Sequence, residues 1–231
     1  MTAEYQEDEA ARLNKLRCLE ILDTFPEEAY DDITFLAAKL AETPIALITL
    51  VDQDRQWFKS KVGVEICETP RDHAICAHAI RAPHELLVVT DAKRDPRFSD
   101  NPLVTGPPGI RFYAGAPLLC SDGMALGTLC VIDQRPRTLT ELQEQALRVL
   151  ARQVVAQIEL RAALARVKRL QGMLPICAHC KKIREDSGYW QRVETYISEH
   201  SEARFTHGIC PDCMDTLYPE ASASIQRQRD S

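Results

Sequence analysis

Two Cys-x-x-Cys pairs, Cys177 with Cys180 and Cys210 with Cys213, are the most specific chemical feature of the chain. Two intervening residues let both thiolates of a pair face one ion, and four thiolates suit a tetrahedral Zn²⁺. All four positions would then be filled by protein, so we expect one structural zinc per chain. Iron, as a single ion or an iron–sulfur cluster, uses the same ligands and is an alternative.

The segment that carries these cysteines, residues 175–219, is short for a folded unit. A unit of this size rarely buries enough apolar surface to fold alone, and metal binding supplies folding free energy. We therefore expect a small C-terminal domain whose fold is stabilised by its bound metal. Another hypothesis keeps the same four cysteines but makes them the detector of a redox or metal sensor.

A second thiol lies beside an imidazole in Cys76-Ala77-His78. A neighbouring imidazole lowers the pKa of a thiol or shares a metal with it. The alternative is a buried cysteine and a helix-capping histidine. Further along, Arg111 has the fork geometry that binds an anion through two hydrogen bonds, unless an ion pair with Asp91 or Asp95 occupies it.

The elements that must position these residues form an α+β domain over residues 25–160. Helical spacing of apolar residues predicts a helix over 7–22 and another reaching residue 41, and we expect a short helix over 72–80. Apolar and alternating runs predict five strands, at 44–52, 56–63, 86–90, 111–119 and 124–132. The remaining ranges are an N-terminal helical segment, 1–24, a linker, 161–174, and a disordered tail, 220–231.

Residues 139–174 predict one long helix with a narrow apolar seam. The seam recurs at alternating spacings of four and three, the pattern of a coiled coil. We expect a parallel homodimer through this helix; the alternative is an amphipathic helix packed on its own domain. The seam residues are Leu142, Ala146, Val149, Gln153, Ala156, Leu160, Ala163, Val167, Leu170 and Leu174.

The central region resembles a GAF domain of the bacterial signalling type. The resemblance rests on short sequence segments at 19–24, 44–48, 51–60, 76–80, 89–92, 95–98, 101–104, 110–118 and 126–133. It implies an antiparallel sheet flanked by helices, with a small ligand held between the sheet and the helices over one face. The C-terminal segment is similar to a short cysteine-rich module of bacterial sensory proteins.

The resemblance implies a sensor whose ligand-binding candidates are Cys76, His78, Phe98, Arg111 and Tyr113. Its ligand is unknown, and ligands of the family range from cyclic nucleotides to bilins, haem and metal centres. The printed sequence has neither a kinase motif nor a diguanylate cyclase motif, so we expect no enzyme and no catalytic residues. The domain would then pass its signal to an unknown signalling partner through the long helix over residues 139–174. The alternative is a free methionine-R-sulfoxide reductase-like enzyme, for which Cys76 lacks an evident second thiol.

Charge and hydropathy bear on the type of partner and on the cellular location of the protein. The net charge is −6, which argues against a nucleic-acid partner even though residues 160–184 carry seven bases and no acid. No apolar run approaches the ~20 residues of a membrane span, and the acidic N-terminus is unlike a secretory signal. We therefore expect a cytoplasmic protein without a membrane contact.

Overall fold

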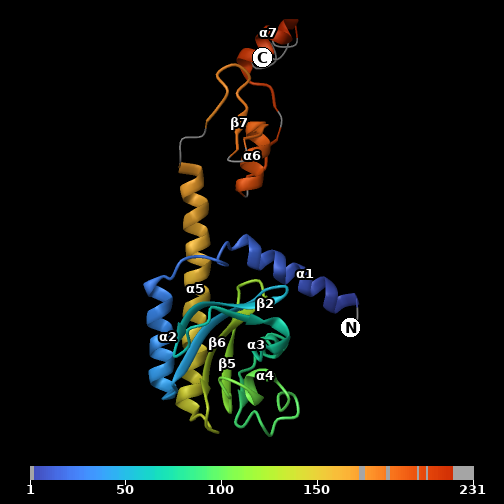
Figure 1. Ribbon diagram of the computed structural model, residues 1–231. Coiled ribbons are helices and arrows are strands. Elements are labelled where there is room, and N and C mark those ends of the chain that lie inside the picture. The colour runs from blue at the N-terminus through green and yellow to red at the C-terminus, as the bar shows by residue number, and fades with distance from the viewer. Residues whose placement is uncertain (1–2, 172–174, 186–187, 202, 207, 221–231) are drawn as a thin grey trace. The chain divides into compact units, whose positions relative to one another are not determined.

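The computed structural model describes residues 3–171, 175–185, 188–201, 203–206 and 208–220. The chain divides into two compact units, residues 1–164 and 165–231, and each is described on its own (Figure 1). Among the described helices, none combines the length and apolar character needed to cross a bilayer.

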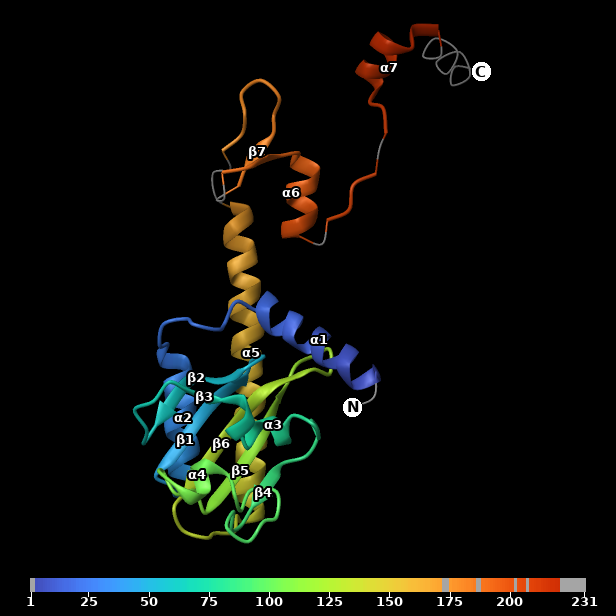
Figure 2. The same cartoon turned by 45° about the vertical axis from the view of Figure 1, so that its right-hand side comes forward.

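A six-stranded antiparallel sheet is the centre of the first unit (Figure 2). Its order is β3-β2-β1-β6-β5-β4, so strands distant in sequence, such as β1 and β6, pair directly. The predicted strands are present, and each end lies within one residue of its prediction. Strand β3 is an addition, because three residues ending in a proline are too short to show alternation. The bounds are β1 Ile45–Val51, β2 Arg55–Val62, β3 Glu68–Pro70, β4 Leu87–Val89, β5 Phe112–Leu119 and β6 Ala125–Asp133.

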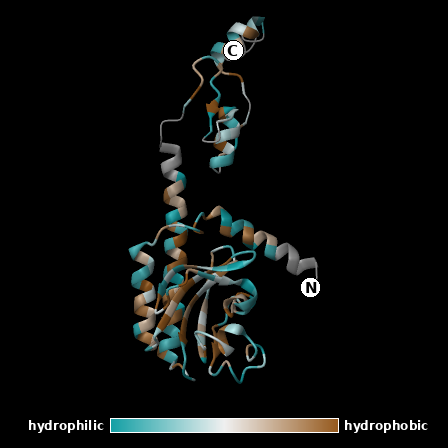
Figure 3. Ribbon diagram, in the orientation of Figure 1, coloured by the Kyte–Doolittle hydropathy of each residue, from teal (hydrophilic) through white to brown (hydrophobic). Residues whose placement is uncertain are grey.

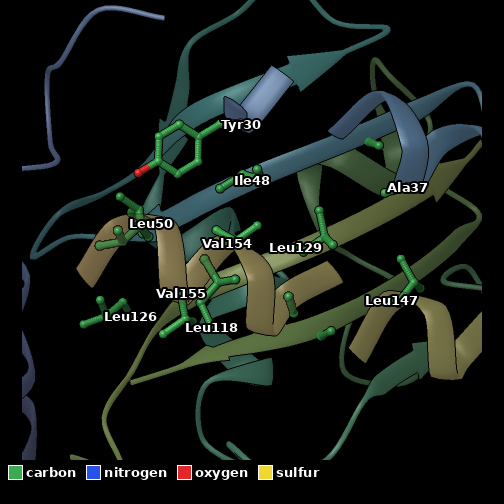
Figure 4. Close-up of a cluster of buried hydrophobic side chains, with 14 of the residues drawn as sticks. Tyr30, Ala37, Ile48, Leu50, Leu118, Leu126, Leu129, Leu147, Val154 and Val155 are labelled. Atoms are coloured by element: carbon green, nitrogen blue, oxygen red, sulfur yellow. The ribbon is translucent and has the colours of Figure 1, made fainter. Parts of the chain in front are cut away.

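One face of the sheet is covered by α2 (Glu28–Ala41) and α5 (Glu141–Gln171), as Figure 1 shows. Alternate strand residues meet the helices in a single apolar core, drawn in Figure 4. Ile48, Leu129 and Val154 are fully buried there. Burial of this kind stabilises by about 1.5–3 kcal/mol per large side chain, so these contacts hold both helices to the sheet.

The opposite face carries the short helices α3 (Cys76–Ala79) and α4 (Pro102–Thr105), preceded by the 3₁₀ turn Arg71–His73. Its apolar cluster contains the other alternate residues of the same strands, including Leu47, Cys130 and Ile132. Figure 3 shows the apolar colour concentrated on the strands between the two helical layers. This second cluster encloses the candidate site.

The N-terminal helix, α1, covers Ala3–Cys18 and ends four residues earlier than expected. Leu19 and Ile21 are buried in the core, but they reach it from a turn in which Glu20 has a φ of 48°. The next helix begins at Glu28. The predicted helix over 72–80 is interrupted, since only the 3₁₀ turn and α3 are helical.

Helix α5 has two apolar faces. Leu147, Val154 and Ile158 pack on the sheet, while Leu142, Val149 and Leu160 of the predicted seam are exposed. The side chains of Val167 and Leu170, and the whole of Leu174, lie outside the described residues.

The second unit contains a two-stranded pair, β7 (Ile183–Arg184) and β8 (Trp190–Gln191), followed by α6 (Val193–His200) and α7 (Pro211–Leu217). Ile183 is buried, and the CxxC turn at 177–180 precedes it. The expected disordered tail falls on residues 221–231, which lie outside the described part of the chain, apart from Glu220.

Candidate ligand-binding site

A mainly apolar pocket lies between the sheet and the α3–α4 side of the first unit. It offers about 50 Å³ to the centres of water-sized molecules. About 10–15 Å³ suffices for one water, so the pocket has room for a small molecule the size of several waters. The wall consists of Ile45, Leu47, Gln56, Phe58, Val64, Ile66, Thr69, Ala74, Ile75, Cys76, Leu103, Pro108, Ile110, Tyr113, Cys130 and Ile132.

Two polar atoms of this wall have no hydrogen-bond partner among the described residues: Gln56 Oε1 and Thr69 Oγ1. The two residues face each other across β2 and β3 in the antiparallel register. Both are buried. A buried polar atom without a partner costs about 1–3 kcal/mol, so these atoms favour a bound molecule that hydrogen-bonds with them.

Three other wall residues, Cys76, Tyr113 and Cys130, form a cluster of thiols and hydroxyls together with Thr128. Tyr113 Oη and Thr128 Oγ1 donate to Cys76 Sγ at 3.2 Å and 3.0 Å. Cys130 Sγ lies 4.0 Å from Cys76 Sγ. Cys76 comes from α3, Tyr113 from β5, and Cys130 and Thr128 from β6, so only the folded sheet brings the four together.

These contacts set the protonation of the thiol. Burial raises the pKa of Cys76, but hydrogen bonds from Cys130, Thr128, Thr49 and Tyr113 outweigh burial and lower the pKa to about 6. The Cys76 hydrogen bond and burial raise the pKa of Cys130 well above its usual value. The arrangement therefore concentrates thiolate character on Cys76, with Cys130 as the protonated neighbour.

Gly115 makes room for the tyrosine of this cluster. It lies two residues after Tyr113 on β5, and therefore on the same face of the sheet. A Cβ at this position would overlap the Tyr113 hydroxyl. The missing side chain thus lets the phenol extend along the strand toward Cys76 and Thr128.

His78 and Phe98 are brought together, but neither is part of the pocket wall. Their rings meet edge to face with centroids 4.9 Å apart. Burial, followed by the charges of Arg81 and Arg97, lowers the pKa of His78. The imidazole therefore packs as a neutral ring against the edge or face of Phe98.

Arg111 lies in a different, open depression. Its Nε and Nη2 donate to Asp91 Oδ1 and Oδ2, both at 2.7 Å. The hydrogen bonds to Arg111 lower the pKa of Asp91. The guanidinium is therefore used in the ion pair, which was the alternative interpretation of the sequence. Of the five candidates, the structure places Cys76 and Tyr113 at the pocket and the other three outside it.

The four metal-ligand candidates form two separate pairs. Backbone amides of Cys180 and then His179 donate to Cys177 and lower its thiol pKa. The amide of Cys213 does the same for Cys210. Each pair thus has the amide-to-sulfur bonds that suit a thiolate ligand. No group of three or more His, Cys, Asp or Glu able to hold a metal occurs in the described part of the chain, so the joined four-cysteine site stays a prediction.

Comparison with known proteins agrees with the geometry of the first unit. The family model of the GAF domain matches residues 26–158, which is more than half of the chain. The chain belongs to the GAF domain family. The sheet with helices on both sides is the fold that the sequence resemblance implied, and a role in sensing and signal regulation follows from the membership.

A cyclic di-GMP phosphodiesterase of Pseudomonas aeruginosa is 45% identical over 158 residues. The match covers 68% of this chain and 27% of that protein, so the chain corresponds to only part of its relative. The relative is an enzyme, and this contradicts the expectation from the sequence that the GAF protein is not one. That expectation was based on missing kinase and cyclase motifs, which are only two of the possible outputs.

Solved structures of low sequence identity align with part of the chain. A chromophore-binding domain of a bacteriophytochrome from R. palustris aligns with a TM-score of 0.50 at 10% identity, covering 71% of this chain and 64% of that one. A GAF domain from an Acinetobacter phosphoenolpyruvate-protein phosphotransferase has a TM-score of 0.49 at 17% identity and covers 71% and 98%.

The sequence analysis missed three residues of the pocket wall, Gln56, Thr69 and Cys130, and Thr128, which donates to the Cys76 thiol. Alternation along β2 places Gln56 on the same face as Phe58, which was a usable signal. The register of β5 with β6 pairs Cys130 with Gly115, and no local pattern reveals that pairing. Cys130 is the second thiol that Cys76 lacked in the sequence analysis.

Proposed function

We propose that residues 26–158 detect a small molecule in the pocket and pass its presence to α5. The observation that carries the proposal is the pair of unpartnered polar atoms, Gln56 Oε1 and Thr69 Oγ1, in an otherwise apolar wall. Such a wall disfavours a charged ligand, because burying an unpaired charge is costly. The ligand is a small uncharged molecule with an apolar body and one hydrogen-bond donor for Gln56.

The signal leaves the pocket through β2. Phe58 belongs to the pocket wall, and Lys59, the next residue, points to the opposite face of the strand. Lys59 Nζ donates to Glu27 Oε1 at 2.6 Å, and Arg161 Nε of α5 donates to the same oxygen at 3.1 Å. A displacement of Phe58 by ligand therefore reaches α5 through one strand residue and one shared carboxylate.

The exposed seam of α5 forms the homodimer interface in this proposal. Leu142, Val149 and Leu160 face solvent in the single chain, and α2 adds exposed Phe35 and Leu40. The two helices lie side by side, since Gln143 Nε2 donates to Leu40 O at 3.0 Å. A second copy pairing along this surface would bury the apolar residues and carry a change in helix packing to both chains.

The C-terminal unit binds the signalling partner once zinc joins its two cysteine pairs. The thiolate-favouring amide bonds in each pair support Zn²⁺, and iron is the competing metal. The relative in Pseudomonas aeruginosa suggests the signalling context. We propose that the GAF domain, acting through the C-terminal unit, regulates the activity of a cyclic di-GMP phosphodiesterase. That enzyme would be part of a longer chain or a separate partner protein.

Phenol and toluene test the pocket, because they have similar size and differ in the hydroxyl. The measurement is the Tm of the reduced full chain at increasing probe concentration. Phenol at ten times its Kd should stabilise by about 1.4 kcal/mol and raise the Tm by about 3–6 °C. Toluene should raise it less. Gln56→Leu should remove the difference between the probes, and Ala74→Leu, which fills the wall, should remove both effects.

Lys93→Met, at an exposed residue away from the pocket, is the control and should retain the phenol response. Equal responses to both probes in the natural chain and in Gln56→Leu would refute the assigned hydrogen bond. A response that persists in Ala74→Leu would refute the pocket itself.

A further inference from the structure

We infer that Cys76 and Cys130 form a peroxide-reactive dithiol that closes to a disulfide inside the GAF domain. The inference uses the pocket of the proposed function but needs no bound ligand. Its first support is distance: the two Sγ atoms are 4.0 Å apart, so they must approach by about 2 Å to reach the ~2.05 Å of a disulfide. They are separated by 54 positions in the sequence, and the short helix α3 packs directly on β6.

The second support is access for a small oxidant. Both cysteines belong to the pocket wall, although they are almost fully buried from bulk solvent. The pocket, with about 50 Å³ for the centres of water-sized molecules, accepts a molecule the size of hydrogen peroxide, which is small and uncharged. Hydrogen peroxide can therefore reach the space that both sulfur atoms line.

The third support is activation of one thiol and not of its neighbours. Hydroxyls of Tyr113 and Thr128 donate to Cys76 Sγ, which stabilises the nucleophilic thiolate. Cys120 offers a comparison within the same domain. It is buried in the core on the other face of the sheet, and burial, with the nearby Glu159, raises its pKa to about 12.

The chemistry balances with peroxide as the only co-reactant. Cys76 sulfur attacks one peroxide oxygen, the O–O bond breaks, and the products are a Cys76 sulfenic acid and one water. Cys130 sulfur then attacks Cys76 sulfur, the S–O bond breaks, and the hydroxyl leaves with the Cys130 proton as a second water. Two thiols are oxidised by two electrons in total, and one peroxide is reduced to two waters.

The disulfide would change the pocket. Cys76 Sγ would move toward β6 and lose the hydrogen bonds from Tyr113 and Thr128. The wall residues on α3 would follow, because Cys76 is the first residue of that helix. Oxidation and ligand binding would then alter the same space, and the domain would respond to both.

The test treats the reduced full chain with hydrogen peroxide, blocks the remaining thiols with N-ethylmaleimide and maps unreduced peptides by mass spectrometry. We expect a Cys76–Cys130 linked peptide that is two hydrogens lighter than the sum of the free peptides. Cys76 should be consumed at least ~10-fold faster than Cys120. In Cys130→Ser the reaction should stop at a Cys76 sulfenic acid, which dimedone traps.

Cys120→Ser is the matched control, because it removes another buried thiol and should leave the linked peptide unchanged. Two results would overturn the inference: Cys76 and Cys130 staying reduced while exposed Cys18 and Cys67 react, or the linkage forming only in denaturant. The mass readout is independent of the phenol experiment. If phenol does not bind but the linked peptide forms, only the proposed ligand is rejected. If phenol binds but the linked peptide does not form, only the dithiol is rejected.

Discussion

Lys59 Nζ donates to Glu27 Oε1 at 2.6 Å, and the lysine side chain is 0% exposed. The same ammonium group also donates to Thr24 Oγ1 and Phe25 O, each at 2.8 Å. A strand residue thus organises the whole segment that leads into α2. Because Arg161 binds the same carboxylate, this segment is shared between the sheet and α5.

Lys59→Met should therefore destabilise the domain and weaken the coupling. The substitution keeps the side-chain length but leaves Thr24, Phe25 and Glu27 without their donor. We expect a loss of about 2 kcal/mol, since Glu27 is partly exposed to water, and a Tm lower by about 4–8 °C. Thermal unfolding measures it. An unchanged Tm, equal to that of the exposed control Lys93→Met, would contradict the role of Lys59.

Stability should rise with pH between about 6 and 9 through Cys76. Its pKa is about 6 in the folded chain and near 9 when unfolded, so in this window the unfolded state binds more protons. The gain is at most about 1.4 kcal/mol per pH unit and is lost as pH falls through 6. Urea unfolding across this range should show the slope in the natural chain and a smaller one in Cys76→Ser.

Tyr113→Phe and Gly115→Ala should both raise the pKa of Cys76. The first removes a donor to the thiol, and the second displaces the phenol that carries it. The thiolate absorbance near 240 nm, taken as the difference from Cys76→Ser, should titrate at higher pH in both variants. A midpoint unchanged in Tyr113→Phe would show that the phenol does not stabilise the thiolate.

Leu160→Asp should convert a homodimer to monomers. A carboxylate in the middle of the apolar seam cannot be desolvated in a two-stranded interface. Sedimentation velocity measures the state, and Gln157→Asp, placed off the seam on the same helix, should leave the dimer intact. If Leu160→Asp sediments as a dimer, the interface lies on another surface.

One zinc per chain should be found by elemental analysis of the purified protein. Cys177→Ser and Cys210→Ser should each reduce the zinc content, because each removes one of four thiolates, whereas Cys67→Ser should retain it. Chelation should reduce the far-UV signal of the C-terminal unit, since binding and folding are linked. Absorption bands near 400 nm with iron in place of zinc would reject the zinc assignment.

The sequence by itself determined the elements and the family. Apolar periodicity located most ends of the strands and helices to within a few residues. The sequence segments between residues 19 and 133 identified the GAF domain. It also predicted one long helix near residues 139–174, because helical spacing depends only on positions along the chain. These properties are local, so a linear pattern contains them.

The tertiary structure alone decided which side chains share the pocket. Cys76 and Cys130 meet because β6 lies between β1 and β5 and places Cys130 on the face that α3 covers. Arg111 pairs with Asp91 because the sheet brings the start of β5 beside the loop after β4. Both outcomes depend on strand order and register, which combine residues far apart in sequence, and no spacing within one segment encodes them.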